Sequence, residues 1–257
     1  MIDLKGRRYI VTGAAGGIGS AIVSTLLEQG ASVALFDLDE ARIADMARAF
    51  DPSGSRTLAV AVDVTDPASV SVAVDRAAGH FGGLDGLVNG AGSVVLDEAW
   101  DAVAADWSRQ LEVNVTGSFL CARAVGEHLR GRGGSIVNVA SNCGKVGYKN
   151  MAAYNAAKAG VISLTRSLSM EWAEDGINVN AVCPGGVDTP MLAGVADWLE
   201  PRLGLPATEI LEGMGSAQLG RKIAPVEVAR VIAFLLSDDA LIIRGQSINV
   251  DGGDTPY

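Results

Sequence analysis

Histidine and cysteine are scarce in this chain of 257 residues, which has two histidines and three cysteines. His80 and His128 follow neither a metal-ligand spacing nor a nucleophile motif, so we expect neither a zinc enzyme nor a serine hydrolase. Cys121, Cys143 and Cys183 are scattered and odd in number, and they predict no disulfide framework. We therefore expect a cytoplasmic protein without a metal centre.

Long apolar runs and positive charge are also lacking. No apolar run approaches the length of a membrane span, and charged residues (Asp3, Lys5 and Arg7) interrupt the start where a secretion signal would lie. Lys and Arg total 20 against 30 Asp and Glu, which gives a net charge of −10. This charge disfavours nucleic acid and anionic membranes. We expect neither a nucleic acid nor a membrane as partner.

Aromatic residues make up only 5% of the chain, whereas hydrophobic residues make up 49% and glycine is abundant. Apolar runs alternate with helical patterns, which is typical of a parallel sheet covered by helices. The length fits one domain, 1–257, with a sizeable core. The predicted fold class is α/β, a single-domain doubly wound fold with a seven-stranded, mainly parallel sheet and helices on both faces. Strands are predicted near 8–12, 32–36, 57–62, 85–89, 134–140, 177–182 and 246–250.

The N-terminus combines a short apolar strand, a glycine-rich turn and an amphipathic helix. Gly13, Gly17 and Gly19 stand where a backbone must turn tightly and approach a phosphate closely. The helix predicted to begin near Gly17 would aim its free N–H groups at a pyrophosphate. Asp37 ends the next predicted strand, and its carboxylate would bind the adenosine ribose hydroxyls and repel a 2′-phosphate. The alternative for Asp37 is an N-cap for a helix that begins near Asp39.

Tyr154 and Lys158 are four residues apart in a segment, 152–173, whose small and apolar residues recur at helical intervals. They therefore share one face of a predicted helix. A lysine ammonium beside a phenol lowers the pKa of the phenol, and such a tyrosine exchanges a proton near neutral pH. Ser141 follows an apolar run that is typical of a buried strand, and at the end of that strand its hydroxyl would be free to hold an oxygen. The Tyr-x-x-x-Lys spacing alone also occurs on ordinary surface helices.

Together these motifs resemble the short-chain dehydrogenase/reductase family over nearly the whole chain. The resemblance rests on TGAAGGIG (12–19), DV (63–64), NGAG (89–92), Asn114, Ser141, YNAAK (154–158), PGGVDTP (184–190) and GQSINVDGG (245–253). The family usually has NNAG at 89–92, and the glycine here removes a side-chain amide that supports the central strand. The resemblance implies a Rossmann fold and hydride transfer between a nicotinamide cofactor, NAD, and a secondary alcohol or ketone.

The resemblance also implies four catalytic residues. Tyr154 would be the general acid in reduction and the base in oxidation, and Lys158 would hold the nicotinamide ribose and keep the pKa of the tyrosine low. Ser141 would bind the substrate oxygen, and Asn114 would anchor a water that links Lys158 to solvent. The alternatives are a helix-kink amide for Asn114 and a strand-end turn residue for Ser141.

Binding residues are implied at positions that match the family motifs. Those for the cofactor are Gly13, Gly17, Ile18, Gly19, Asp37, Asp63, Val64, Asn89, Ala91, Gly92, Tyr154, Lys158, Pro184, Gly185, Val187 and Thr189. Val187 and Thr189 would bind the carboxamide of nicotinamide, unless they belong to an ordinary loop. Those for the substrate are Ser141, Cys143, Tyr148 and Tyr154, with Cys143 equally explained as a packing residue. Lys145 and Lys149 follow, either to meet a polar or anionic substrate or as part of a solvated loop.

Three functions are open. The first is an NAD-dependent dehydrogenase of a polyol or diol, which segment 141–158 and the C-terminal motif resemble. The second is a 3-oxoacyl-thioester reductase acting on acyl carrier protein substrates, which usually prefers NADPH and keeps basic residues near the glycine turn or after the second strand. The positions concerned are Ala15, Gly16, Leu38 and Asp39, and none is basic. The third is a non-catalytic nucleotide-sensing protein, which would lack the tyrosine or the lysine.

Segment 190–224 breaks the alternation of strands and helices and is rich in Gly, Met, Leu and Pro. It would lie beyond the carboxyl ends of the strands, so we predict that it is a lid over the substrate. The resemblance further implies a homotetramer, in which apolar residues of two long helices are buried between subunits. The residues expected there are Ala122, Val125, Leu164 and Leu168.

Overall fold

The computed structural model describes residues 2–216 and 218–255, and within them seven parallel strands form one sheet. The sheet order is β3-β2-β1-β4-β5-β6-β7. The strands are β1 (Arg8–Thr12), β2 (Ser32–Asp37), β3 (Thr57–Ala61), β4 (Gly86–Asn89), β5 (Gly134–Val139), β6 (Ile177–Pro184) and β7 (Ser247–Val250). Each predicted strand is confirmed to within two residues. The sheet that was predicted to be mainly parallel is parallel in every pairing of the described strands.

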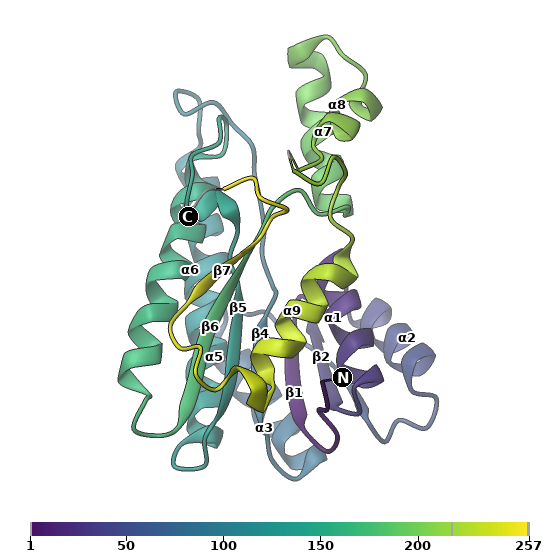
Figure 1. Cartoon of the computed structure of the whole chain (residues 1–257), viewed down its shortest axis with the longest axis vertical. Helices are drawn as coiled ribbons and strands as arrows, with labels where there is room; N and C mark the ends of the chain where they lie inside the picture. The colour runs from purple at the N-terminus through teal and green to yellow at the C-terminus, as the bar shows by residue number, and fades with distance from the viewer. Residues whose placement is uncertain (1, 217, 256–257) are drawn as a thin grey trace.

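Helices cover both faces of the sheet (Figure 1). One layer consists of α1 (Gly17–Glu28), α2 (Glu40–Phe50) and α9 (Pro225–Leu236). The other contains α3 (Pro67–Phe81), α4 (Ala104–Leu111), α5 (Gly117–Leu129) and α6 (Ala152–Glu171). The central strands between them are rich in Val, Ile, Leu and Ala, as is typical of strands whose two faces are both buried. No helix in the described ranges is long and apolar enough to cross a membrane.

The order of the strands reverses between β1 and β4, which lie side by side in the middle of the sheet. In doubly wound sheets a ligand binds in the crevice beyond the carboxyl ends of the strands at such a point. The glycine-rich turn follows β1 here, and the NGAG turn follows β4. The topology therefore brings together two motifs that are more than seventy residues apart in the chain.

Local signals in the sequence explain where two of the helices begin. Asp66 caps α3 by accepting a hydrogen bond from the N–H of Ala68 at 3.0 Å, and Pro67 opens the helix. Asp39 caps α2 by accepting from the N–H of Arg42 at 3.0 Å. The alternative for Asp37 is therefore wrong, since Asp39 is the N-cap and Asp37 still belongs to β2.

The long helix expected within 98–130 is interrupted where it carries Asn114. A π-helical turn of 5 residues, η1 (Glu112–Thr116), separates α4 from α5. Such turns occur as single bulges in helices, often at functional sites. The expectation that apolar residues of α5 and α6 face another subunit is wrong for Ala122, Val125 and Leu168. These three side chains are at most 3% exposed within one chain, and Leu164 packs against the same core.

Two helices occupy the segment that was predicted to be a lid, and they stand clear of the sheet layers (Figure 1). They are α7 (Pro190–Leu203) and α8 (Ala207–Gly213), and residue 217 of the expected segment lies outside the described residues. Thr189 caps α7 by accepting from the N–H of Leu192 at 3.3 Å. The segment that breaks the alternation of strands and helices is therefore itself largely helical.

The two stretches of chain that lead into and out of this segment lie side by side. Val187 and Ile223 form a parallel β-bridge. An ion pair of 2.7 Å joins Lys222 to Asp188 on the same two stretches. The bridge and the ion pair together hold both ends of the segment close to the carboxyl end of β6.

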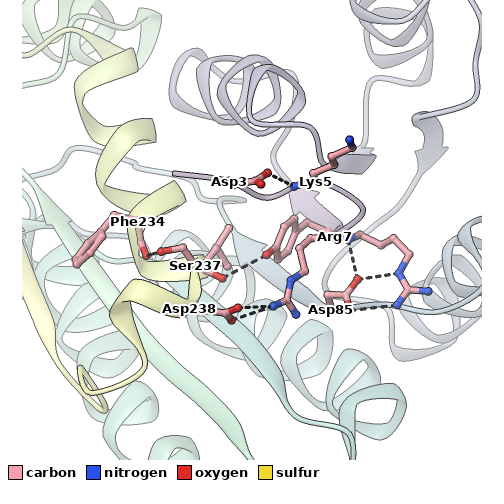
Figure 2. Close-up of polar contacts among 10 residues, drawn as sticks. Asp3, Lys5, Arg7, Asp85, Phe234, Ser237 and Asp238 are labelled. Atoms are coloured by element: carbon pink, nitrogen blue, oxygen red, sulfur yellow. Dashed lines mark hydrogen bonds and ion pairs between the residues drawn. The ribbon is translucent and has the colours of Figure 1, made fainter. Parts of the chain in front are cut away.

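Polar contacts surround the start of β1, at the amino ends of the central strands. Figure 2 shows Arg7 directed at Asp238, beyond the end of α9, with bonds of 2.9 and 2.8 Å. Arg8 pairs with Asp85 at 2.7 Å, and this half-buried contact is the less solvent-screened of the two. The hydroxyl of Ser237 donates to the carbonyl oxygen of Phe234 at 2.7 Å. These contacts therefore lie at the end of the central strands that is opposite to the crevice.

Candidate active site

The glycine-rich turn after β1 packs directly against the turn after β4. Gly13 has a φ of +66°, and a Cβ atom there would lie 2.7 Å from the backbone nitrogen of Ala91. A Cβ atom on Gly19 would overlap the carbonyl oxygen of Gly13. Both positions therefore exclude a larger residue. The hydroxyl of Thr12 completes the junction by accepting from the N–H groups of Gly90 and Ala91, each at 3.1 Å.

α1 begins at this turn with its first N–H groups open. Among the described residues no side chain caps it, its N-cap is Gly16, and its first turn has no acidic residue. A helix start of this kind favours an anion. Asp37 reaches the same turn from the end of β2. Its two carboxylate oxygens accept from the N–H of Ala15 at 2.9 Å and from the N–H of Asp39 at 3.3 Å.

A cavity of about 430 Å³ opens between these turns. Its wall includes ten of the predicted cofactor-binding residues, namely Gly13, Gly17, Ile18, Gly19, Asp37, Asp63, Val64, Ala91, Gly92 and Thr189. Thr65 donates to one oxygen of Asp63 through its hydroxyl at 2.7 Å and its N–H at 2.9 Å. These bonds lower the pKa of Asp63 and keep a negative charge at the wall.

Tyr154 and Lys158 lie one turn apart on α6, as their spacing predicts. The Lys158 ammonium lies 5.5 Å from the centre of the Tyr154 ring and donates to the carbonyl oxygen of Val139 at 2.8 Å. Burial lowers the pKa of Lys158 to about 8. Burial also raises the pKa of Tyr154, and the hydroxyl of Ser141 offsets only part of that rise. The direction of this shift is opposite to the expected lowering of the tyrosine pKa, because desolvation is its largest cause.

Asn114 is brought next to Lys158 by the π-helical turn. Its Nδ2 donates to the carbonyl oxygens of Gln110 at 2.8 Å and Ser93 at 2.9 Å. Its Oδ1 is buried and has no hydrogen-bond partner in the described part of the chain. A Cβ atom on Gly92 would lie 2.9 Å from that oxygen and 3.4 Å from Lys158 Nζ. Both groups therefore face one small space, and a helix-kink amide alone does not explain the open oxygen.

Ser141 follows β5 and begins η2 (Asn142–Gly144). Its Oγ accepts from the N–H of Cys143 at 3.1 Å, so its alternative role as a turn residue is present in the structure. The Nδ2 of Asn142 donates to the hydroxyl of Tyr148 at 3.0 Å, which holds that half-exposed ring beside the serine. Burial raises the pKa of the Cys143 thiol. The predicted substrate residues thus lie on one short stretch beyond β5.

Several predicted residues lie outside the wall of this cavity. They are Asn89, Asn114, Ser141, Cys143, Tyr148, Tyr154, Lys158, Pro184, Gly185 and Val187. Asn89 is buried within the sheet, where its Nδ2 donates to Asn138 Oδ1 at 2.9 Å. The side chain of Lys145 bonds to β7, where its Nζ donates to the carbonyl oxygen of Ser247 at 2.7 Å. Lys149 is exposed on the loop before α6.

Known proteins share this fold and much of this sequence. Residues 13–255 match the family model described as enoyl-(acyl carrier protein) reductase. The chain is 45% identical over 252 residues to cis-4-hydroxycyclohexanecarboxylate dehydrogenase of Sinomonas cyclohexanicum, which covers 97% of this chain and 96% of the relative. A solved short-chain type dehydrogenase/reductase from Mycobacterium marinum matches with a TM-score of 0.90 and 31% identity, over 100% of this chain and 98% of that one. This chain belongs to the short-chain dehydrogenase/reductase family.

A further relative of this short-chain dehydrogenase/reductase carries a cofactor in its name. It is the NAD-dependent glycerol dehydrogenase of Listeria innocua, 38% identical over 248 residues, or 96% of this chain and 92% of the relative. The protein is an oxidoreductase that acts on CH–OH groups with a nicotinamide cofactor. The residues present fit that cofactor. The open start of α1 suits a pyrophosphate, and the partnerless Oδ1 of Asn114 lies beside the lysine expected at the nicotinamide ribose.

The cavity wall of this short-chain dehydrogenase/reductase also contains residues that sequence reasoning missed, among them Arg42, Ser93, Arg109 and Val113. No cation stands at positions 15, 16, 38 or 39, as the sequence indicates. Arg42 nevertheless brings a positive charge to the wall that contains Asp37. Arg42 stands one helical turn after the N-cap Asp39, so a helix start placed at Asp39 is the signal that would have found it.

Proposed function

We propose that this enzyme catalyses the NAD-dependent interconversion of a secondary alcohol and a ketone, with a polyol or diol as the alcohol. One observation carries the proposal: Asn114 Oδ1 and Lys158 Nζ both lie next to Gly92, and Lys158 Nζ also lies near the ring of Tyr154. The bound cofactor supplies the hydride acceptor or donor at its nicotinamide ring. The protein then has to supply orientation and a path for one proton.

The proton path runs through residues of α6 and η1. Tyr154 accepts the proton of the alcohol during oxidation and returns it during reduction, while Ser141 holds the substrate oxygen. Burial raises the pKa of Tyr154, so the base form depends on a nearby positive charge. Lys158, with a pKa of about 8, is mostly protonated near neutral pH and supplies that charge. Asn114 Oδ1 accepts a hydrogen bond from a water that links Lys158 to solvent.

The preference for NAD over NADP is supported by Asp37. Its carboxylate lies in the cavity wall and would repel a 2′-phosphate. Arg42 in the same wall acts in the opposite direction, because a guanidinium attracts a phosphate. Asp37 is held against the glycine-rich turn by the N–H of Ala15, whereas Arg42 is an exposed side chain of α2. The fixed carboxylate is therefore the stronger determinant.

A second substrate class is favoured by the relative that is 45% identical and named for a hydroxylated ring acid. An alicyclic secondary alcohol would suit the apolar side chains near the site. Met191 at the start of α7 belongs to the cavity wall and is half-exposed, and Val95 follows the NGAG turn. Ring alcohols therefore belong in the same test as polyols.

We propose further that the enzyme works in the cytoplasm as a homotetramer. Its cysteines, Cys121, Cys143 and Cys183, are free, which suits a reducing compartment. We also propose one catalytic domain, 1–257, whose segment 190–224 covers the substrate; residues 1, 217, 256 and 257 lie outside the described residues. The exposed apolar side chains of Met191 and Leu203 on α7, and of Leu205 after it, support this role for the lid.

A substrate panel tests the proposal. The enzyme is mixed with NAD or NADP and with glycerol, threitol, a vicinal diol, 4-hydroxycyclohexanecarboxylate or a 3-hydroxyacyl thioester, and NAD(P)H absorbance is followed. We expect NADH formation with polyols, diols or the ring alcohol. Turnover confined to the thioester with NADP would support the reductase of acyl thioesters instead. Binding of NADH without turnover of any class would support the nucleotide sensor.

A further inference from the structure

A line of buried hydrogen bonds, made by side chains and by two backbone carbonyl oxygens, connects α6 to η1 through the central strands. It runs from Thr165 on α6 through Asn138 on β5 and Asn89 on β4 to Ser118 on α5. The exposed fractions of these side chains are 0%, 1%, 3% and 6% in that order. The line ends at Asn114 in η1. We call these five residues the polar line.

Each link in the polar line is a short hydrogen bond with a defined donor. Asn138 Nδ2 donates to Thr165 Oγ1 at 2.9 Å, and Asn138 Oδ1 accepts from Asn89 Nδ2 at 2.9 Å. Asn89 Nδ2 also donates to the carbonyl oxygen of Ser118 at 3.0 Å. Ser118 Oγ donates to the carbonyl oxygen of Asn114 at 2.7 Å. In a dry interior, loss of the Thr165, Asn138 or Asn89 side chain removes a hydrogen-bond partner of another buried side chain. Loss of the Ser118 hydroxyl removes a donor to the backbone carbonyl oxygen of Asn114 and leaves the bond from Asn89 in place.

The polar line holds α6 on β5 next to the catalytic lysine. Lys158 and Thr165 are seven residues apart, which is about two helical turns, so they lie on one face of α6. They bind consecutive residues of β5, because Lys158 Nζ donates to the carbonyl oxygen of Val139 and Thr165 accepts from Asn138. The position of α6 along β5 is therefore set at two points, and one of them is the lysine itself.

We propose that Thr165 and Ser118 are positioning residues that set the separation of Lys158 Nζ and Asn114 Oδ1 through the polar line. The two atoms come from different helices, α6 and η1, and the described residues show no direct bond between them. The line joins those helices through the central strands. This inference rests on the proposed dehydrogenase function, in which that separation governs the proton path.

The alternative is that the polar line only stabilises the fold. A variant would then lower the amount of folded enzyme and its melting temperature without changing the chemistry of the folded fraction. A positioning role predicts more. If α6 shifts on β5, the Lys158 charge is misplaced relative to Tyr154, and the phenolate is less well stabilised. Alcohol oxidation, which needs the phenolate, would then require a higher pH.

The first experiment compares Thr165→Val, Thr165→Ser, Ser118→Ala and a control, Ser169→Ala. Ser169 lies on α6 and is buried like the others, but it makes no hydrogen bond within the polar line. We expect kcat to fall about tenfold or more in the Val and Ala variants of the line, with little change in KM for NAD. The pH of half-maximal oxidation should rise in both. Thr165→Ser should restore parent behaviour, and the control should retain it.

The second experiment combines Thr165→Val with Ser118→Ala. If both act through one line, the double variant should lose less than the product of the two single losses in kcat. Independent effects that multiply would contradict the proposal. Unchanged kcat and pH profile in the folded Val variant would also overturn it, even if its melting temperature fell.

Amide hydrogen exchange provides a readout that needs no turnover. In Thr165→Val, exchange across 112–116 should accelerate about tenfold, although Thr165 lies on another helix. Ser169→Ala should leave that stretch unchanged. Acceleration confined to α6 would overturn the positioning role. If the parent enzyme oxidises no alcohol in the panel, the proposed function fails, and the exchange at η1 still decides whether the line couples the two helices.

Discussion

Lys158 brings an ionisable group into an almost fully buried position, where it is 4% exposed. Burial disfavours its charged form and lowers its pKa to about 8, against an ordinary value of about 10.4. Between these two values the unfolded chain holds the proton more tightly than the folded one. The contribution of Lys158 to stability therefore rises with pH in this window, by at most about 1.4 kcal/mol per pH unit.

Replacing Lys158 with Met should accordingly stabilise the fold at pH 7 while removing activity. The melting temperature of the variant should exceed that of the parent by a few degrees at pH 7, because the cost of burying a charge is absent. The difference should shrink as the pH is raised from about 8 to about 10. Thermal unfolding of both proteins across that range measures it. A difference that stays constant with pH would show that the charge of Lys158 is not costly.

Asp37 and Arg42 allow a test of cofactor preference with matched variants. Asp37→Asn removes the charge but keeps an oxygen that can accept from the N–H of Ala15. We expect this variant to raise kcat/KM for NADP about tenfold, since the repulsion of the 2′-phosphate is gone and Arg42 is left to attract it. Adding Arg42→Ala should reverse most of the gain. Equal or better kcat/KM with NADP in the parent enzyme would contradict the preference for NAD.

The sequence predicts the residues of the site better than their protonation. Spacing places Tyr154 and Lys158 on one face of α6, and the structure confirms it. The direction of the tyrosine pKa shift depends on how deeply α6 is buried and on which acceptor the ammonium binds. Neither is encoded in a four-residue spacing. Arg42 escaped prediction for a similar reason, because its approach to the cavity follows from where Asp39 starts α2.

Among the elements, the strands were the most predictable. Their apolar runs are short, bounded and buried on both faces, so composition alone marks them. The π-helical turn η1 was not predictable, because Glu112–Thr116 keeps a helical pattern and only the tertiary contacts of Asn114 reveal the extra residue. The bounds of the helices within 190–224 were not predicted either. Thr189 and Pro190 form an ordinary helix start there, although glycine and proline recur along the segment.

The lid formed by α7 and α8 should become more rigid when the site is filled. Its two ends are fixed at the junction of Val187 with Ile223, while Gly204, with a φ of +67°, separates the two helices. Amide exchange across 190–216 should slow markedly when NAD and a substrate analogue are added together. Exchange that is already as slow in the free enzyme as in β4 and β5 would identify a fixed cap instead.

Trp198 offers an independent probe of the same element. It lies on α7, with the guanidinium of Arg202 3.4 Å from its ring centre. Its fluorescence can be followed once the other tryptophans, Trp100, Trp107 and Trp172, are replaced. A change on adding NAD with the analogue, absent with the analogue alone, would place the movement of α7 after cofactor binding.

At the scale of the whole molecule, the exposed apolar side chains lie on different surfaces from those expected. Ala122, Val125 and Leu168 belong to the core of one chain, whereas other large apolar side chains remain exposed on and before α4 and α5. These are Trp100, Val103, Trp107 and Phe119. Grouped apolar side chains of this kind favour association.

Light scattering should therefore give a tetramer at micromolar concentration. Trp107→Glu should weaken it, because a charge would be buried between subunits. Met170→Glu, an exposed position on α6, is a control for the added charge. A parent protein that scatters as a monomer would contradict the proposed tetramer. If both variants dissociate to the same extent, the added charge would explain the loss, and α4 would not be assigned to the interface between subunits.

The central claim is that Tyr154 exchanges the proton during NAD-dependent oxidation of an alcohol. The most direct measurement compares the parent with Tyr154→Phe for kcat, by NADH absorbance with the best alcohol of the panel, and for NADH binding, by fluorescence titration. Because the substitution removes the hydroxyl and leaves Lys158 in place, we predict a loss of turnover of about 10²–10⁴-fold with NADH binding nearly intact. A Phe variant that keeps most of its turnover would show that another group moves the proton.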